Sequence, residues 1–239
     1  MKKHISHRAG ARARMASLLA IIAVGPALAR FPSPVHAAVA RIAPYLMASK
    51  QREIALARTA APASVSMHAT VMVLGDRGYV TAAKGNNGFV CLVMRSWDNS
   101  VSVKSVTFWD PKFHVPNCFN AAAARTVLPE YLMKTRWAIA GDDRAEIADR
   151  EKAARAAGKL EKPAAGALCY MMSKRSWGVG GQPGPWRPHL MFYFPRARTP
   201  DWGANLNGNP VFAGAADHAT VFFVLVPVWS DGTPAPRFE

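Results

Sequence analysis

The chain has 239 residues, half of them hydrophobic, and carries 30 lysine and arginine residues against 15 aspartate and glutamate residues, a net charge of +15. A chain of this length can bury the core of one domain without needing a metal or several disulfides to hold it together. The basic charge favours an anionic partner, but the sequence contains no basic helix and no aromatic RNA-binding signature, so nucleic-acid binding is not predicted.

The N-terminal residues have the pattern of a cleavable secretory signal. Five basic residues and no acidic residue occur in the first fourteen positions, and an apolar segment follows at residues 15–29. This segment is shorter than the roughly 20 residues that a transmembrane helix needs, but it has the length of a signal's hydrophobic region. Small residues mark cleavage sites after Ala29 and after Ala37, and the arginine directly after Ala29 favours the second. The sequence therefore predicts a signal peptide at residues 1–37 and a single domain at residues 38–239; the alternative is an uncleaved membrane anchor.

Export would change both the charge and the surroundings of the chain. Without residues 1–37 the chain keeps 24 basic and 15 acidic residues, a net charge of +9, so much of the total charge belongs to the signal. The remaining charge favours an anionic small molecule or an anionic envelope surface as the partner. We therefore expect a periplasmic or extracellular protein with no nucleic-acid partner and, after cleavage, no transmembrane segment.

Three cysteines indicate one disulfide and one free thiol in an oxidising compartment. Cys169 lies in a short apolar run that is typical of a buried strand, where a thiol packs as a small apolar group. We therefore predict a disulfide between Cys91 and Cys118, which would stabilise the fold by about 3 kcal/mol through its effect on the unfolded chain. Spacing alone leaves the other two pairings open.

The first half of the mature chain is predicted to contain one helix and three strands. Apolar residues recur at helical spacing between two prolines, which predicts a helix over residues 45–61. Residues 69–74, 78–82 and 88–97 are short runs rich in β-branched and aromatic residues, separated by turns that contain glycine. Because these turns are short, we expect a three-stranded antiparallel meander.

Helices follow a loop that contains two prolines. They are expected at residues 121–128, 129–141 and 143–158, because Asn120 and Asp143 are good N-caps and glycines end the second and third helices. The third of these helices consists mostly of alanine and charged residues, so we expect it to form a solvated surface.

The remaining strands are expected at residues 167–174, 189–195 and 220–228. The last of these is apolar on both faces, which predicts a central position in the sheet. Two long loops, residues 173–188 and 196–219, contain large aromatic side chains that favour packing against the domain. The predicted fold class is α+β, with an antiparallel or mixed sheet of about six strands and helices mainly on one face.

Several segments resemble a family of uncharacterised bacterial proteins that carry signal peptides and are exported. The similar segments are residues 52–64, 87–93, 167–173 and 188–193, and the similarity extends over most of the mature chain. The resemblance implies export and a shared single-domain fold. It implies no activity, no cofactor and no role for a particular residue.

The sharpest candidate site comes from the alternation of side chains along the predicted strands. His189 and Tyr193 lie on one face of the strand at residues 189–195, and the phenylalanines lie on the other. If the phenylalanine face packs under the helices, His189 and Tyr193 emerge on the open face near Arg95, with Trp186 in the adjoining loop. A histidine, a tyrosine and an arginine on a sheet face could hold an anionic or aromatic ligand. The alternative is that His189 ends a strand and that Tyr193 faces water.

An enzyme would need a nucleophile and a base among the same residues. No recognised motif surrounds any candidate, and burial in an apolar strand raises the pKa of a cysteine. The scattered histidines predict no metal site, and the glycine-rich segment in the first long loop lacks the helix that must follow a phosphate loop, so no cofactor is predicted. The candidate groups are Cys91, Cys169 and Ser173 as nucleophiles and His114, His189 and Lys174 as their partners.

These patterns favour a binding protein over an enzyme. We expect a non-enzymatic envelope module that binds a ligand or partner through the open sheet face and the two tryptophan-containing loops. The alternative is a small exported hydrolase or transferase that uses Cys91 or His189, and a third class is a structural component without a pocket. A disulfide at Cys91 together with a pocket lined by His189 and Tyr193 would favour binding, whereas a free thiolate beside a histidine would favour catalysis.

Overall fold

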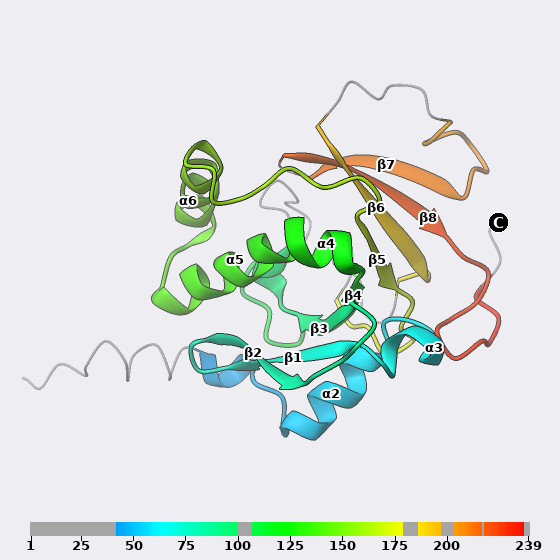
Figure 1. The fold of residues 1–239 in the computed structure, drawn as a ribbon, viewed down its shortest axis with the longest axis horizontal. Coiled ribbons are helices and arrows are strands. Elements are labelled where there is room, and N and C mark those ends of the chain that lie inside the picture. The colour runs from blue at the N-terminus through cyan, green and yellow to red at the C-terminus, as the bar shows by residue number, and fades with distance from the viewer. Residues whose placement is uncertain (1–41, 100–106, 179–185, 197–202, 217, 237–239) are drawn as a thin grey trace, which may run out of the picture. The chain divides into compact units, whose positions relative to one another are not determined.

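A mixed β-sheet organises the fold (Figure 1). The predicted signal peptide at residues 1–37 lies outside the described residues, and in the part of the chain that is described we find no helix with the length and apolar character needed to cross a bilayer. All described residues belong to one compact unit. The computed structural model describes residues 42–99, 107–178, 186–196, 203–216 and 218–236.

The sheet has eight strands in the order β2-β1-β3-β4-β5-β6-β8-β7. Neighbouring strands are antiparallel except for β1 and β3, which run parallel. The predicted α+β class with a mixed sheet is confirmed, with eight strands where about six were expected. β8 lies inside the sheet, but it neighbours the edge strand β7 and is not central. The strands are β1 (Thr70–Gly75), β2 (Gly78–Ala83), β3 (Val90–Met94), β4 (Val115–Phe119), β5 (Leu168–Met171), β6 (His189–Pro195), β7 (Val211–Ala216) and β8 (Ala219–Leu225).

The first three strands do not form the antiparallel meander that their short turns predict. β1 and β2 make a hairpin, with Gly78 at a positive φ of 123°, but β3 pairs with the other edge of β1 and runs parallel to it. The chain reaches that edge by crossing the start of β1 at Gly85, whose amide donates to Thr70 Oγ1 at 3.0 Å. A Cβ atom on Gly85 would lie 2.2 Å from the backbone of Ala69, so only glycine permits this crossing.

β4 and β7 are the two strands that the sequence did not predict. β4 contains Pro116, which has no N–H and is therefore rare in the interior of a sheet. Pro116 faces Val93 of β3, whereas β5 pairs only with Cys118 and Phe119, so the proline lies where β4 has one neighbour. β7 consists mostly of alanine and glycine, a composition with low β propensity, and it lies at the sheet edge against β8.

The helix ends agree closely with the predicted caps. Asn120 caps α4, Gly141 ends α5 in the left-handed conformation, and Asp143 forms a capping box at the start of α6. The helix predicted at residues 45–61 is shorter in the structure. The chain first makes one 3-10 turn, and Ser49 then caps the start of the α-helix. The helical elements are η1 (Ala43–Tyr45), α2 (Lys50–Arg58), α3 (Ala63–Ser66), η2 (Ser96–Asp98), α4 (Ala121–Thr126), α5 (Leu128–Ala140) and α6 (Arg144–Ala156).

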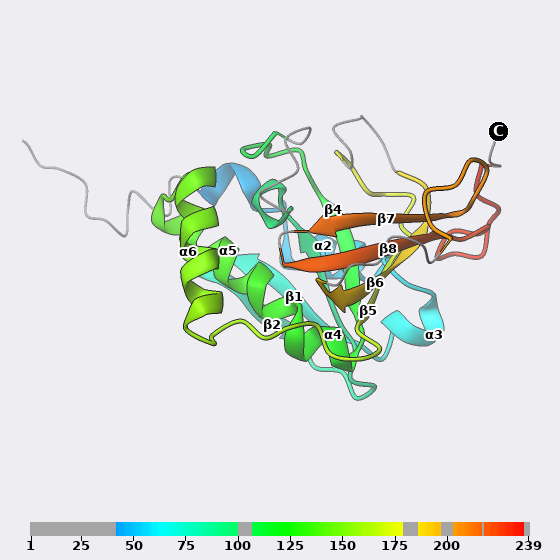
Figure 2. The same ribbon diagram turned by 90° about the horizontal axis from the view of Figure 1, so that it is seen from above.

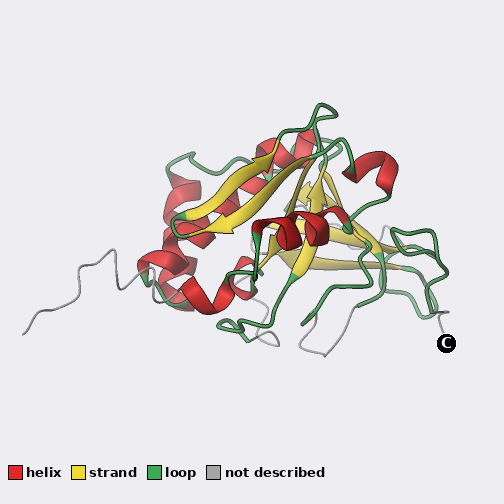
Figure 3. Ribbon diagram, turned by 90° about the horizontal axis from the view of Figure 1, so that it is seen from below, coloured by secondary structure: helices red, strands yellow, loops and turns green. Residues whose placement is uncertain are grey.

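Helices cover both faces of the sheet. In β3, Cys91 and Val93 pack with α2 in one apolar cluster, whereas Leu92 and Met94 pack with α4 and α5 in another. α2 contacts β1, β3 and β4, and Figure 3 shows the molecule from the side of this helix. α6 packs against α5 (Figure 2). α4 and α5 therefore cover one face of β3 and α2 covers the other, because both faces of this strand are apolar and each needs a cover.

Cys91 and Cys118 form the predicted disulfide. The two residues face each other across the antiparallel pair of β3 and β4, with their Cα atoms 4.0 Å apart. Cys169 is the free cysteine and is buried in a strand, as predicted. A disulfide between two strands of the core is typical of proteins from oxidising compartments.

Candidate functional site

The predicted ligand site depends on which face of β6 the helices cover, and in the structure they cover the face opposite to the predicted one. Met191 and Tyr193 belong to the apolar cluster under α4 and α5, and His189 lies on the same face of the strand. His189 is 2% exposed and Tyr193 is 6% exposed. Phe192 and Phe194 lie on the opposite face and are partly exposed. The expectation that His189 and Tyr193 emerge on an open face is therefore wrong, because the helices cover their face and not the phenylalanine face.

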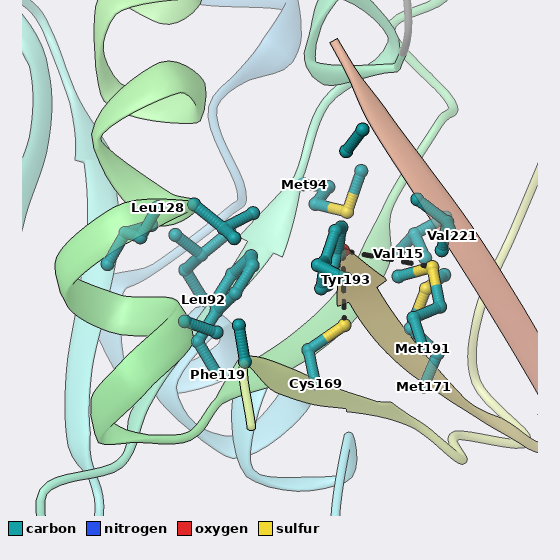
Figure 4. Packing of buried hydrophobic residues seen from close by; sticks show 14 of the residues in the cluster. Leu92, Met94, Val115, Phe119, Leu128, Cys169, Met171, Met191, Tyr193 and Val221 are labelled. Atoms are coloured by element: carbon teal, nitrogen blue, oxygen red, sulfur yellow. Dashed lines mark hydrogen bonds between the residues drawn. The ribbon is translucent and has the colours of Figure 1, made fainter. Parts of the chain in front are cut away.

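Tyr193 is part of the core (Figure 4). Its hydroxyl oxygen lies 3.3 Å from Cys169 Sγ and 3.3 Å from Tyr131 Oη. Burial raises the pKa of the Cys169 thiol to about 12 and raises the pKa of Tyr193 well above its usual value. Cys169 is therefore a neutral thiol near pH 7 and is unsuited to nucleophilic attack.

Arg95 has no exposed surface and acts as a structural clamp. Its guanidinium donates to Glu53 Oε1 at 2.9 Å and to two backbone carbonyl oxygens. Glu53 also accepts from the amide of Leu74, so both members of the ion pair are fully engaged. β4 and β5 separate β3 from β6, so Arg95 and His189 lie on strands at least roughly 14 Å apart at ordinary strand spacing.

Trp186 is the residue of the predicted site that reaches the surface, with 38% of it exposed. Its ring lies against His189, with the two ring centroids 4.6 Å apart. His189 Nδ1 donates to the carbonyl oxygen of Arg187, and burial lowers the pKa of His189 to about 4, so the ring is neutral near pH 7. The predicted set of Arg95, Trp186, His189 and Tyr193 is therefore not gathered in one pocket.

The other candidate nucleophiles, Cys91 and Ser173, are engaged in structural contacts. Cys91 has no thiol, because it is bonded to Cys118. Ser173 is 1% exposed, and its Oγ lies 2.6 Å from Thr59 Oγ1. The neighbouring Lys174 forms an ion pair with Asp231 at 3.0 Å. These contacts hold the segment after β5 in place, and they do not activate a nucleophile.

A hollow of about 230 Å³ lies beside the segment that follows α6 and the C-terminal end of β6. Two of its lining residues are apolar and supply a hydrophobic wall, and the other four are basic. Such a lining suits an anion better than a neutral or cationic ligand. The described residues that line this anion pocket are Arg155, Leu160, Lys162, Pro195, Arg196 and His218.

Buried ion pairs form the base of the anion pocket. Lys134, which is 1% exposed, donates to Glu130 Oε1 at 2.6 Å and lies 3.1 Å from Glu151 Oε2. Arg155 binds the other oxygen atom of each carboxylate, at 2.6 Å from Glu130 and 2.9 Å from Glu151. Burial alone would raise the pKa of Glu130, but Lys134 and the other positive groups around it lower it, so the carboxylate stays charged. The two carboxylates thus fix the guanidinium of Arg155 at the wall of the pocket.

His218 adds a further basic group from the start of β8. Its Nδ1 lies 3.5 Å from Glu130 Oε2 and 3.8 Å from Glu151 Oε1. The pocket and its base together contain four lysine and arginine side chains and two carboxylates, a net charge of +2 when His218 is neutral. The potential in the hollow is therefore positive.

Glu130, Glu151 and His218 also have the residue types of a metal site, with one ligand atom from each within 4.8 Å of the others. However, Lys134 and Arg155 already bind both carboxylates. A divalent cation would have to enter beside two positive groups, which repel it strongly at such short distances. The arrangement therefore fits an ion-pair cluster better than a metal centre.

The sequence does not predict this site, because the alanine and charged residues of α6 are typical of a solvated helix surface. Ile147 and Glu151 are buried in the structure, and α6 contacts α5. The available signal was the i, i+4 spacing of two acid–base pairs, Glu130 with Lys134 and Glu151 with Arg155. That spacing places each pair on one helix face, but it does not show that the two faces meet.

Comparisons with protein-family models, with curated proteins and with solved structures find no match for this chain. They therefore assign no role to any residue, and a functional proposal must rest on geometry and charge. The resemblance to exported bacterial proteins stays a prediction from the sequence.

Proposed function

We propose that the protein is an exported module that binds a small anionic ligand in the anion pocket. The observation that carries this proposal is the fixed position of Arg155, which two buried carboxylates hold at the wall of a basic hollow. A cation that is held in place before binding loses little conformational entropy when the anion arrives. Hydrogen bonds from such a charged donor to a carboxylate or phosphate oxygen are also about twice as strong as neutral ones.

The dimensions of the pocket limit the ligand. Its volume of about 230 Å³ is below the roughly 300–1,000 Å³ that is usual for sites of drug-sized ligands. Inorganic phosphate or a small di- or tricarboxylic acid matches this volume and the positive charge of the lining. Leu160 and Pro195 supply an apolar wall for the carbon atoms of a carboxylic acid.

Binding is favoured over the alternative of a hydrolase or transferase. Cys91 is in a disulfide, so it has no thiolate to attack a substrate. His189 is a neutral, buried ring beneath Trp186, with one nitrogen donating to a backbone carbonyl. Among the residues that the structure describes, neither group stands beside an activated partner that would make it a catalyst.

Calorimetric titration of the full chain with phosphate, succinate and citrate at constant ionic strength tests the proposal. We expect at least one of these anions to bind, and the Arg196→Gln and Lys162→Gln variants to bind it about tenfold more weakly, the loss expected for one charge-assisted contact. Lys152→Gln is the matched control, because Lys152 is an exposed residue of α6 that is not part of the pocket lining. Equal weakening in the control, or no binding of any of the three anions, would contradict the proposal.

Export is a separate part of the proposal and has its own test. It is supported by the signal pattern at residues 1–37 and by the disulfide between β3 and β4. Protein isolated from the periplasm or medium without reductant is expected to begin after Ala37 and to show one thiol per chain, accessible only after unfolding because Cys169 is buried. Full-length protein in the cytoplasm with three reactive thiols would overturn this part of the proposal.

A further inference from the structure

A groove of about 420 Å³ lies between the turn that precedes β4 and the turn that follows β5. Its volume is larger than that of the anion pocket, and none of its lining residues lines that pocket. The groove therefore offers a second surface whose chemistry can be considered independently. Its lining residues are Leu56, Pro111, Lys112, His114, Arg175 and Trp177.

One wall of the groove is held by hydrogen bonds to two other elements. The amide of Trp177 donates to the carbonyl oxygen of His114 at 3.0 Å, and the amide of His114 donates back at 3.1 Å. The amide of Arg175 donates to Ser173 Oγ at 3.0 Å, and this oxygen lies 2.6 Å from Thr59 Oγ1 at the end of α2. Arg175 and Trp177 are thus presented by a turn that is tied to both β4 and α2.

The opposite wall is a second fixed turn. Asp110 Oδ1 accepts from the amide of Lys112 at 2.9 Å, and the amide of Asp110 donates to Ser96 Oγ at 3.0 Å. Phe113, which follows Lys112, is buried and anchors the turn in the core. Because both walls are ordered before a ligand arrives, binding here does not have to order them.

The exposed groups of the groove combine an aromatic face with positive charge. Trp177 is 44% exposed although its backbone is fixed, so its indole face is available for a flat, partly apolar ring. Lys112 and Arg175 line the same groove, and arginine in particular binds carboxylates through two parallel hydrogen bonds.

His114 adds a neutral ring to the lining of the groove. Burial, with a contribution from the charge of Arg95, lowers the pKa of His114 to about 4, so the ring carries no charge near pH 7. Its Nε2 is buried and has no hydrogen-bond partner among the described residues. The ring therefore adds no charge to the groove, and its buried Nε2 offers no contact to a ligand, so the positive charge of the groove comes from Lys112 and Arg175.

We propose that this groove binds an acidic saccharide, a chain of sugar rings that carry carboxylates. Trp177 contacts the face of one ring, and Arg175 and Lys112 pair with carboxylates. A volume of about 420 Å³ favours a saccharide over a small aromatic acid, which would fill only part of the groove.

Titration of the full chain with trigalacturonic acid tests this proposal, with maltotriose as the neutral sugar and benzoate as the small aromatic acid. We expect trigalacturonic acid to bind more tightly than either of the other two. Arg175→Gln should weaken its binding at least tenfold, and Trp177→Ala should weaken it further than Trp177→Phe, which keeps an aromatic face.

The adjacent Lys174→Gln is the matched control, because Lys174 pairs with Asp231 and does not line the groove. It should change the dissociation constant for the trisaccharide less than about twofold, as should the anion-pocket variant Arg196→Gln. Equal binding of maltotriose, tighter binding of benzoate, loss of binding in Lys174→Gln as large as in Arg175→Gln, or no binding of trigalacturonic acid would each overturn the proposal.

Discussion

The molecule contains two buried charge networks that differ in what surrounds them. In the first, Arg95 pairs with Glu53, and Asp98 Oδ2 accepts from the amide of Arg95 and from Tyr79 Oη. Thr135 Oγ1 donates to the other carboxylate oxygen of Asp98. Arg95 is 0% exposed and Asp98 is 2% exposed, so this network faces protein on all sides. Its charges hold η2 and α2 to the sheet and are unavailable to a ligand.

The second network, between α5 and α6, has the same kinds of group but one open side. Lys134 is as deeply buried as Arg95, whereas the side chain of Arg155 is 19% exposed and lines the anion pocket. The contrast shows that a buried ion pair by itself indicates only a structural constraint. A binding site is indicated where such a pair holds a charged group at the wall of a hollow.

The largest expected difference between the networks is in the response to loss of an arginine. Arg95→Met leaves Glu53 buried without its cation and should lower the free energy of unfolding by about 3–5 kcal/mol. Arg155→Met should lower it by only about 1–2 kcal/mol, because Lys134 still binds both carboxylates, but it should abolish anion binding. Urea unfolding and anion titration check both effects. Equal destabilisation by Arg95→Met and Arg155→Met, or anion binding retained in Arg155→Met, would contradict this distinction between the two networks.

The carboxyl groups of the two networks are expected to respond to pH in opposite directions. Burial raises the pKa of Asp98 to about 6, despite the hydrogen bonds that it accepts. Because this pKa lies above the unfolded value of 3.8, the stability that Asp98 contributes is fully present below that value and is lost, by about 3 kcal/mol, as the pH rises through 6. The pKa of Glu130 is lowered from 4.5, so its contribution is present above that pH and is lost as the pH falls.

Urea unfolding at several pH values between about 3 and 7 separates these two effects, because the Glu130 transition lies below pH 4.5 and the Asp98 transition extends up to about 6. Relative to the unsubstituted protein, Asp98→Asn should become more stable as the pH rises through this range, since asparagine does not ionise. Glu130→Gln should instead be most destabilising at the upper end of the range. Parallel pH dependence in the two variants would contradict the assignment of opposite pKa shifts.

The smallest expected effect is that of salt. Anion binding at the open side of the second network should weaken by about two- to threefold when the ionic strength rises from roughly 0.05 to 0.15 M, because exposed charges are screened over a Debye length of about 10 Å. The destabilisation caused by Arg95→Met should not change, since the first network is excluded from solvent. A salt dependence of similar size in both measurements would mean that both networks are open to solvent.

Local signals in the sequence were sufficient for the caps of α4 and α6, and they favoured the disulfide that forms. Asn120 and Asp143 bond to amides within three residues, so their role as caps needs no tertiary information. The pairing of Cys91 with Cys118 followed from the apolar neighbours of Cys169, which identified it as a core residue.

Choices that depend on distant parts of the chain were not predictable. Both faces of β6 are apolar, with Met191 and Tyr193 on one and Phe192 and Phe194 on the other, so alternation cannot tell which face the helices cover. The crossing at Gly85 looks like an ordinary turn until the close approach of the backbone is known. The anion pocket was not predictable for the same reason, since its basic residues come together only when α6 packs on α5 near the end of β6.

The most direct test of ligand binding in the anion pocket is to locate a small anion on the full chain by nuclear magnetic resonance. During titration with the tightest-binding of phosphate, succinate and citrate, we expect the signals of Arg155, Arg196 and His218 to shift together with one dissociation constant, while the signals of Arg95 stay unchanged. Shifts that spread over exposed lysines without saturation, or that occur only around Arg175 and Trp177, would contradict binding in the pocket.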